Sequence, residues 1–138
     1  MRLVVTGSRF WANRIRLVIA LNRARLHCAA KGEPFEIAFG DCPTGADEIT
    51  WDWARHWQLG FRRFEIPRRS DGSWIGGKEQ GPLRNRRMVD QFQPDWVLAC
   101  LLDEHLGASK GTRGCRDYAV SQGARPWDLI EPPFQGGT

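Results

Sequence analysis

The chain has 138 residues, of which 41% are hydrophobic and 26% are charged, as in one ordinary globular domain. This length supports a hydrophobic core without disulfides, and the four cysteines lack the close spacing of a zinc site. No signal peptide or membrane-spanning segment is present in the sequence, which predicts a cytoplasmic protein without membrane partners.

Short apolar runs alternate with amphipathic segments along the whole chain. Strands are predicted at residues 2–7, 35–40, 61–66, 96–100 and 125–130, with the third at an edge of the sheet. Helices are predicted at residues 13–30, 46–58, 82–92 and 113–122. The glycine-rich stretch 68–81 is predicted to be a flexible loop, and residues 131–138 a flexible tail after a domain of residues 1–130.

This alternation predicts a single α/β domain with a mainly parallel sheet of about five strands and helices on both faces. In such sheets a ligand binds outside the carboxyl ends of the strands. The segments that directly follow the predicted strands are therefore where functional residues are expected.

The segments after the first two strands carry glycine, hydroxyl, guanidinium and carboxylate groups. Glycine permits a sharp turn and close approach of a ligand, while a helix start offers free N–H groups to phosphate. Carboxylates in such loops suit ribose hydroxyls. The candidate ligand-binding residues here are Gly7, Ser8, Arg9, Gly40, Asp41, Thr44, Gly45, Ala46 and Asp47.

Two later segments have the same character. "GPLRNRR" places Arg84 and Asn85 at a helix start, and "SKGTRG" follows the fourth strand with Ser109, Gly111 and Thr112. Each segment by itself is equally well explained as a tight turn or a capped helix start. Taken together, four such segments at one edge of the sheet favour a ligand that contains phosphate and ribose.

The ordered set "VVTGSRFW", "GDCPTGADEITWDWA", "GPLRNRRMV", "DWVLAC" and "SKGTRGC" resembles the YspA/YpsA-related branch of the SLOG superfamily, over about residues 2–130. The resemblance implies a Rossmann-like fold, a nucleotide-derived ligand and a homodimer or higher homo-oligomer. Relatives include DprA proteins, cytokinin-activating phosphoribohydrolases and ligand-sensing domains of anti-phage systems. Small proteins of this branch also occur in actinobacterial phages.

The leading hypothesis is binding, for sensing or sequestration, of a phosphorylated nucleotide derivative such as an ADP-ribose-like molecule or a nucleotide second messenger. No cofactor and no metal ion is expected. The first alternative is an N-glycoside hydrolase of nucleoside monophosphates, with Arg84, Asp41 and Asp47 as candidate catalytic residues. The phosphoribohydrolase glutamate is replaced here by Cys115, which is either a nucleophile or, preferably, a structural residue.

The second alternative is single-stranded nucleic-acid binding, by analogy with DprA. It depends on the basic pI and on arginines 62, 63, 68, 69, 86 and 87. Among the seven tryptophans, Trp11 or Trp74 is a candidate for stacking on a base, although Trp11 fits the core equally well. The core is expected to contain Trp53, Trp57 and Trp96, together with Cys28 and Cys100, and no role is assigned to His27, His56 or His105.

Overall fold

The computed structural model describes residues 1–103 and 109–132. Its five strands are β1 (Arg2–Gly7), β2 (Glu36–Gly40), β3 (Phe61–Phe64), β4 (Trp96–Leu102) and β5 (Arg125–Glu131). Its four helices are α1 (Arg14–Lys31), α2 (Ala46–His56), α3 (Gln80–Phe92) and α4 (Lys110–Ser121). The predicted order of strands and helices is confirmed, and β3 is an edge strand as expected.

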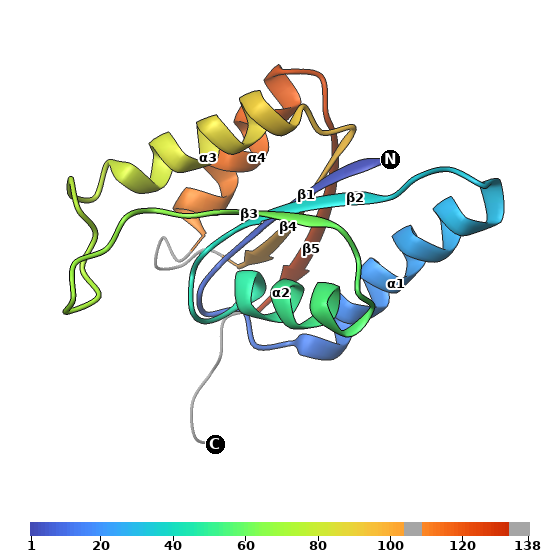
Figure 1. Cartoon of the computed structure of the whole chain (residues 1–138), viewed down its shortest axis with the longest axis horizontal. Coiled ribbons are helices and arrows are strands. Elements are labelled where there is room, and N and C mark those ends of the chain that lie inside the picture. Colours follow the sequence, from blue (N-terminus) through green and yellow to red (C-terminus); the bar gives the residue numbers. More distant parts are fainter. Residues whose placement is uncertain (104–108, 133–138) are drawn as a thin grey trace.

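The strands form one sheet in the order β3-β2-β1-β4-β5, and every neighbouring pair is parallel. Helices α1 and α2 cover one face of the sheet, and α3 and α4 cover the other (Figure 1). This is the predicted Rossmann-like α/β domain. The order reverses at β1, which lies between β2 and β4, so this is the switch point at which a ligand is expected.

The core has two layers because side chains of a strand alternate between the two faces of a sheet. One layer contains Leu3, Val5 and Phe39 against α1 and α2, and the other contains Val4 and Ala38 against α3 and α4. None of the helices within the described ranges is long and apolar enough to cross a membrane.

Several boundaries differ from the sequence predictions by one to three residues. Helix α4 begins at Lys110 rather than at residue 113, so "SKGTRG" is mostly the first turn of a helix rather than a loop. Strand β5 includes Glu131, which pairs with Leu102 and is therefore not part of a tail. The stretch 68–81 contains a bridge between Arg68 and Trp74, and α3 already begins within it. Residues 133–138 of the predicted tail and His105 lie outside the described residues.

The expected core residues Trp53, Cys28 and Cys100 are buried. Trp57, by contrast, is 42% exposed, and the prediction that it lies in the core is wrong. It follows the last residue of α2, and the guanidinium of Arg25 lies 3.9 Å from the centre of its ring. Trp96 is half-buried and packs only at the margin of the core.

Candidate functional site

The loops after β1 and β2 are packed tightly against each other at the carboxyl edge of the sheet. Gly45 has a φ of 76°, and a Cβ atom placed on it would lie 2.3 Å from the carbonyl oxygen of Ser8. The N–H of Ala46 donates to that same oxygen at 3.3 Å, and the hydroxyl of Thr44 donates to the carbonyl of Arg9 at 3.1 Å. The two loops are therefore in direct backbone contact, and Gly45 is the residue that permits it.

The first of these loops presents its side chains unequally to solvent. Ser8 is buried, and its hydroxyl oxygen accepts the N–H of Phe10 at 3.0 Å, so it holds the turn. Arg9 is exposed, lies over the ring of Phe10, and has no carboxylate partner among the described residues. Arg9 is therefore the guanidinium of this loop that can reach a ligand.

Gly7 meets a packing requirement as well. A Cβ atom on Gly7 would lie 2.4 Å from the Cβ of Ala46 and 2.8 Å from the Cβ of Cys100. The end of β1 is thus enclosed between the first turn of α2 and strand β4, with no room for a side chain.

Arg84 reaches from α3 to the end of β2 and lies beside two carboxylates. Its Nη1 donates to Asp41 Oδ1 at 2.9 Å and to the carbonyl of Phe64 at 3.3 Å, while its Nε donates to Asn85 Oδ1 at 2.8 Å. Gly40 makes this possible, because a Cβ on Gly40 would lie 2.5 Å from Arg84 Nη1 and 2.7 Å from Asp47 Oδ2. The side chains of Arg84 and Asp41 are only 11% and 5% exposed, so this is a buried ion pair.

Both carboxylate oxygens of Asp41 have partners within the protein. Its Oδ2 accepts the backbone N–H of Ile66 at 2.9 Å, and its Oδ1 also lies 3.6 Å from Arg68 Nη2. Its carbonyl oxygen accepts hydrogen bonds from Arg63 and Arg68. Asp41 therefore anchors the segment after β3 and positions Arg84, and the ribose contact predicted for it would require this network to open.

Asp47 lies in the first turn of α2 and is buried beside the same guanidinium. Its Oδ2 accepts the N–H of Cys42 at 3.1 Å. Burial raises the pKa of Asp47 above its ordinary value, and this effect outweighs the opposing effects of Arg84 and of the Cys42 N–H. The sequence placed Asp41 and Asp47 together after the second strand, but in the structure only Asp41 lies in the loop, whereas Asp47 belongs to α2 and has different hydrogen-bond partners.

Asp47→Asn is expected to become more stable relative to the wild type as pH rises from 4 to 8. The folded state holds the Asp47 proton more tightly than the unfolded chain, so stability from this group is fully present below pH 3.8 and is lost as pH rises through the folded-state pKa. Asparagine does not titrate. Urea unfolding of both proteins at each pH measures the difference in their free energies of unfolding.

The matched control is Asp71→Asn. Asp71 is exposed, and hydrogen bonds from the side chain and backbone of Ser73 lower its pKa. The stabilising effect of ionised Asp71 is present above the unfolded-state pKa and is lost only at lower pH. The difference in free energy of unfolding between Asp71→Asn and the wild type should therefore stay constant from pH 5 to 8. An equally flat difference for Asp47→Asn would contradict the expected burial effect.

The start of α4 completes this edge of the sheet. The Ser109 hydroxyl accepts the N–H of Leu102 at 2.8 Å and donates to its carbonyl at 3.3 Å, so it is tied to the end of β4 and does not cap the helix. Thr112 is buried. Among the described residues, no atom other than those of its chain neighbours and of the backbone of α4 lies within 4 Å of a Cβ built on Gly111.

Cys115 lies one turn further along α4 and is 3% exposed. Burial raises the pKa of its thiol to about 11, although a hydrogen bond with Thr6 acts in the opposite direction. The thiol is therefore protonated near neutral pH and enclosed in the core. This burial favours the structural role of Cys115 over that of a nucleophile, because a reactive cysteine needs an accessible thiolate.

The structure thus brings the predicted residues of the first three segments together at one edge, with the start of α4 beside them. Sequence reasoning missed the contribution of Arg63 and Arg68 to the Asp41 network, although both were noted as part of a basic stretch. Trp11 is 2% exposed and its indole N–H donates to the carbonyl of Asn13, so it is a core residue and not a stacking platform. The half-buried Trp74 packs against Gly81.

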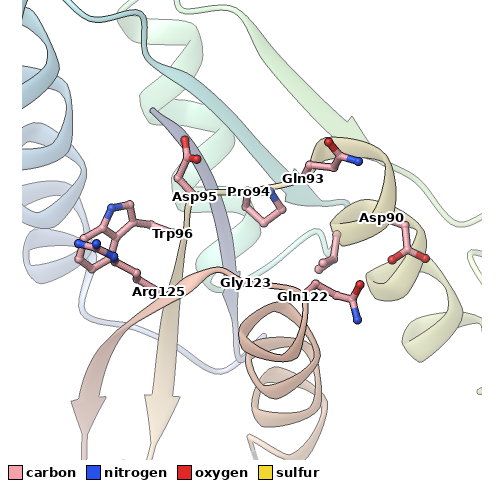
Figure 2. A pocket seen from close by; sticks show the side chains of 9 residues that line it. Asp90, Gln93, Pro94, Asp95, Trp96, Gln122, Gly123 and Arg125 are labelled. Carbon is pink, nitrogen blue, oxygen red and sulfur yellow. The ribbon is translucent and has the colours of Figure 1, made fainter.

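Two cavities lie away from this edge. One, of about 650 Å³, lies at the amino ends of β4 and β5, between the carboxyl-terminal ends of α3 and α4 (Figure 2). The other, of about 580 Å³, lies between α1 and the same two strands, and Trp96 lines both.

The fold and the arrangement of loops define a Rossmann-like α/β protein with its polar residues gathered at the switch point of the sheet. No protein-family model matches the chain. The chain is 36% identical over 124 residues to the Gene 61 protein of Mycobacterium phage D29, across 88% of this chain and 90% of that protein. The chain therefore belongs to the family of the phage Gene 61 protein.

Proposed function

We propose that the chain is a SLOG-type protein that binds a phosphorylated nucleotide-derived ligand at the carboxyl edge of its sheet. The observation that carries this proposal is that the starts of α2 and α4 lie beside the switch point of the sheet, together with Arg9 and Arg84. The first turns of α2 and α4 have N–H groups without partners inside their helices. Such groups, together with the exposed Arg9, suit a phosphate.

Binding is favoured over hydrolysis by the state of the two carboxylates. Asp41 is held by Arg84 and by a backbone N–H, and Asp47 is buried with a raised pKa. Cleavage of a glycosidic bond needs a carboxyl group near the anomeric carbon. Neither aspartate is exposed toward solvent in the structure, which supports a role in holding Arg84 rather than in attacking a substrate.

The test is isothermal titration of the purified protein with AMP and with ADP-ribose, after native mass spectrometry has shown whether it already carries a nucleotide. Arg9→Ala is expected to weaken binding by about tenfold to a hundredfold, the effect of losing a charge-assisted hydrogen bond of about 1.5–3 kcal/mol. Its stability should change by less than about 0.5 kcal/mol, because the side chain is exposed.

Arg55→Ala is the control, because Arg55 is an exposed guanidinium in the last turn of α2, at the opposite end of that helix from the site. It should bind both probes like the wild type. Equal affinity of Arg9→Ala and the wild type would refute the proposed site. Release of free base from AMP during the titration would instead favour the hydrolase.

A second candidate function, binding of single-stranded nucleic acid, is favoured by the charge distribution. Residues 62–87 contain eight Arg or Lys residues and three Asp or Glu residues, a net charge of +5, whereas the whole chain carries +4. Most of these cations are exposed on β3, the following segment and α3. Oligonucleotide binding that falls steeply with salt, and is weakened in Arg62→Gln and Arg69→Gln, would support it.

A further inference from the structure

We propose that the cavity between α1 and the amino ends of β4 and β5 is a second binding site, for a planar aromatic anion. The cavity has a volume of about 580 Å³, and the residues that line it are Met1, Arg23, Ala24, His27, Trp96 and Trp127. It lies at the opposite end of β4 from the candidate nucleotide site, so the two ligands would not compete directly.

Two indole rings from neighbouring strands form the sheet side of this cavity. Trp96 pairs with Arg125 and Leu98 pairs with Trp127, so both tryptophans point to the α1 side of the sheet. Both are half-buried, whereas Trp11 and Trp53 on the same side are 2% and 5% exposed. Large aromatic faces at a cavity favour a flat ring as ligand, because stacked aromatic pairs gain energy beyond the area they bury.

The charged groups at this cavity all have one sign. Arg23 reaches it from α1. Arg125 lines the neighbouring cavity of about 650 Å³, and its guanidinium lies 5.6 Å from the centre of the Trp96 ring, with which it overlaps in Figure 2. Within residues 1–103 and 109–132, neither arginine forms an ion pair with a carboxylate, and no acidic residue lines the cavity. Arg116 on the other face, by contrast, pairs with both Asp117 and Asp128.

The size of the cavity favours a small molecule over a macromolecule. Its volume falls within the range of about 300–1,000 Å³ that is typical of small-ligand pockets. A stable protein interface, by comparison, uses about 20–30 residues from each partner. An aromatic carboxylate or a small aromatic phosphate would contact Arg23 through its anionic end and Trp96 and Trp127 through its ring.

The test is isothermal titration with 2-naphthoate, with 2-naphthylmethylammonium as the probe of opposite charge. Naphthoate is expected to bind at one site per chain, and the cation is expected not to bind. Arg23→Gln should weaken naphthoate binding by about tenfold, as for the loss of one charge-assisted hydrogen bond. Trp127→Leu should weaken it further, whereas Trp74→Leu, which changes a half-buried tryptophan elsewhere, should not.

Arg23 is exposed, so Arg23→Gln tests the site even if Trp127→Leu disturbs folding. Unchanged naphthoate affinity in Arg23→Gln, or equal binding of the two probes, would overturn the proposal. Weakened naphthoate binding in Arg9→Ala would overturn it too, because it would place naphthoate at the carboxyl edge. Sedimentation of the same proteins tests whether this surface instead joins two copies of the chain. If the wild type is a dimer and both Arg23→Gln and Trp127→Leu are monomers, the cavity is part of a subunit interface and the proposed small-molecule site is overturned.

Discussion

Gly45→Ala is expected to lower the free energy of unfolding by about 3 kcal/mol or more, enough to leave a domain of this size largely unfolded at moderate urea concentrations. Two effects add. A residue other than glycine at φ 76° costs about 1–2 kcal/mol in backbone strain. The new Cβ would also lie 2.3 Å from the Ser8 carbonyl oxygen and 2.6 Å from the Arg9 backbone, which cannot move aside as a flexible side chain can.

Gly32→Ala is the matched control for this substitution. Gly32 also has a left-handed φ, of 67°, but apart from its chain neighbours no atom of the described residues lies within 4 Å of the Cβ position. Its cost should be limited to strain, about 1 kcal/mol. Urea unfolding followed by circular dichroism measures both variants, and an equal loss of stability in the two would contradict the close packing of the loops after β1 and β2.

Arg84→Met is expected to destabilise the fold by about 3–5 kcal/mol, because it leaves Asp41 as a buried carboxylate without its closest cation. Methionine keeps much of the apolar part of the arginine side chain, so the loss of stability arises mainly from removal of the positive charge. Asp47 is affected as well, since Arg84 is the strongest of the groups that lower its pKa and so favour its ionised form.

The double variant Arg84→Met/Asp41→Asn should recover part of this loss of stability. The reason is that substitutions of two residues that form one ion pair do not have additive effects on the free energy of unfolding. Arg87→Met is the single-site control on the same helix. Arg87 is exposed, and within the described part of the chain it donates to the Glu65 carbonyl alone, so its loss should cost less than about 0.5 kcal/mol. Additive effects of the two substitutions in the double variant would argue against a coupled pair.

The fold was predictable because its signals are local. Each strand is a short apolar run, and each helix carries a buried stripe, so alternation alone indicated a parallel sheet with helices on both faces. The start of α4 was mispredicted because Gly111 has low helix propensity. Burial of Thr112, Cys115 and Ala119 on one side of α4 outweighs that preference.

The site was predictable only in part. Its location followed from the rule that ligands bind at the carboxyl ends of parallel strands, and the segments after β1 and β2 that carry Arg9, Asp41 and Asp47 do meet there. The pairing of Arg84 with Asp41 joins residues 43 apart in the chain, and no spacing rule indicates it. The exposure of Trp57 was missed because helical periodicity no longer applies beyond the end of α2.

The strand order also bears on how the chain folds as it is synthesised. The first 64 residues supply three adjacent strands, β1, β2 and β3, but one side of β1 stays unpaired until β4 arrives at Trp96. That side is a row of free backbone N–H and C=O groups beside the buried residues Leu3, Val4 and Val5, which is a template for pairing with another chain. A nascent or truncated chain that ends before β4 would therefore carry an aggregation-prone edge in the middle of what becomes the sheet.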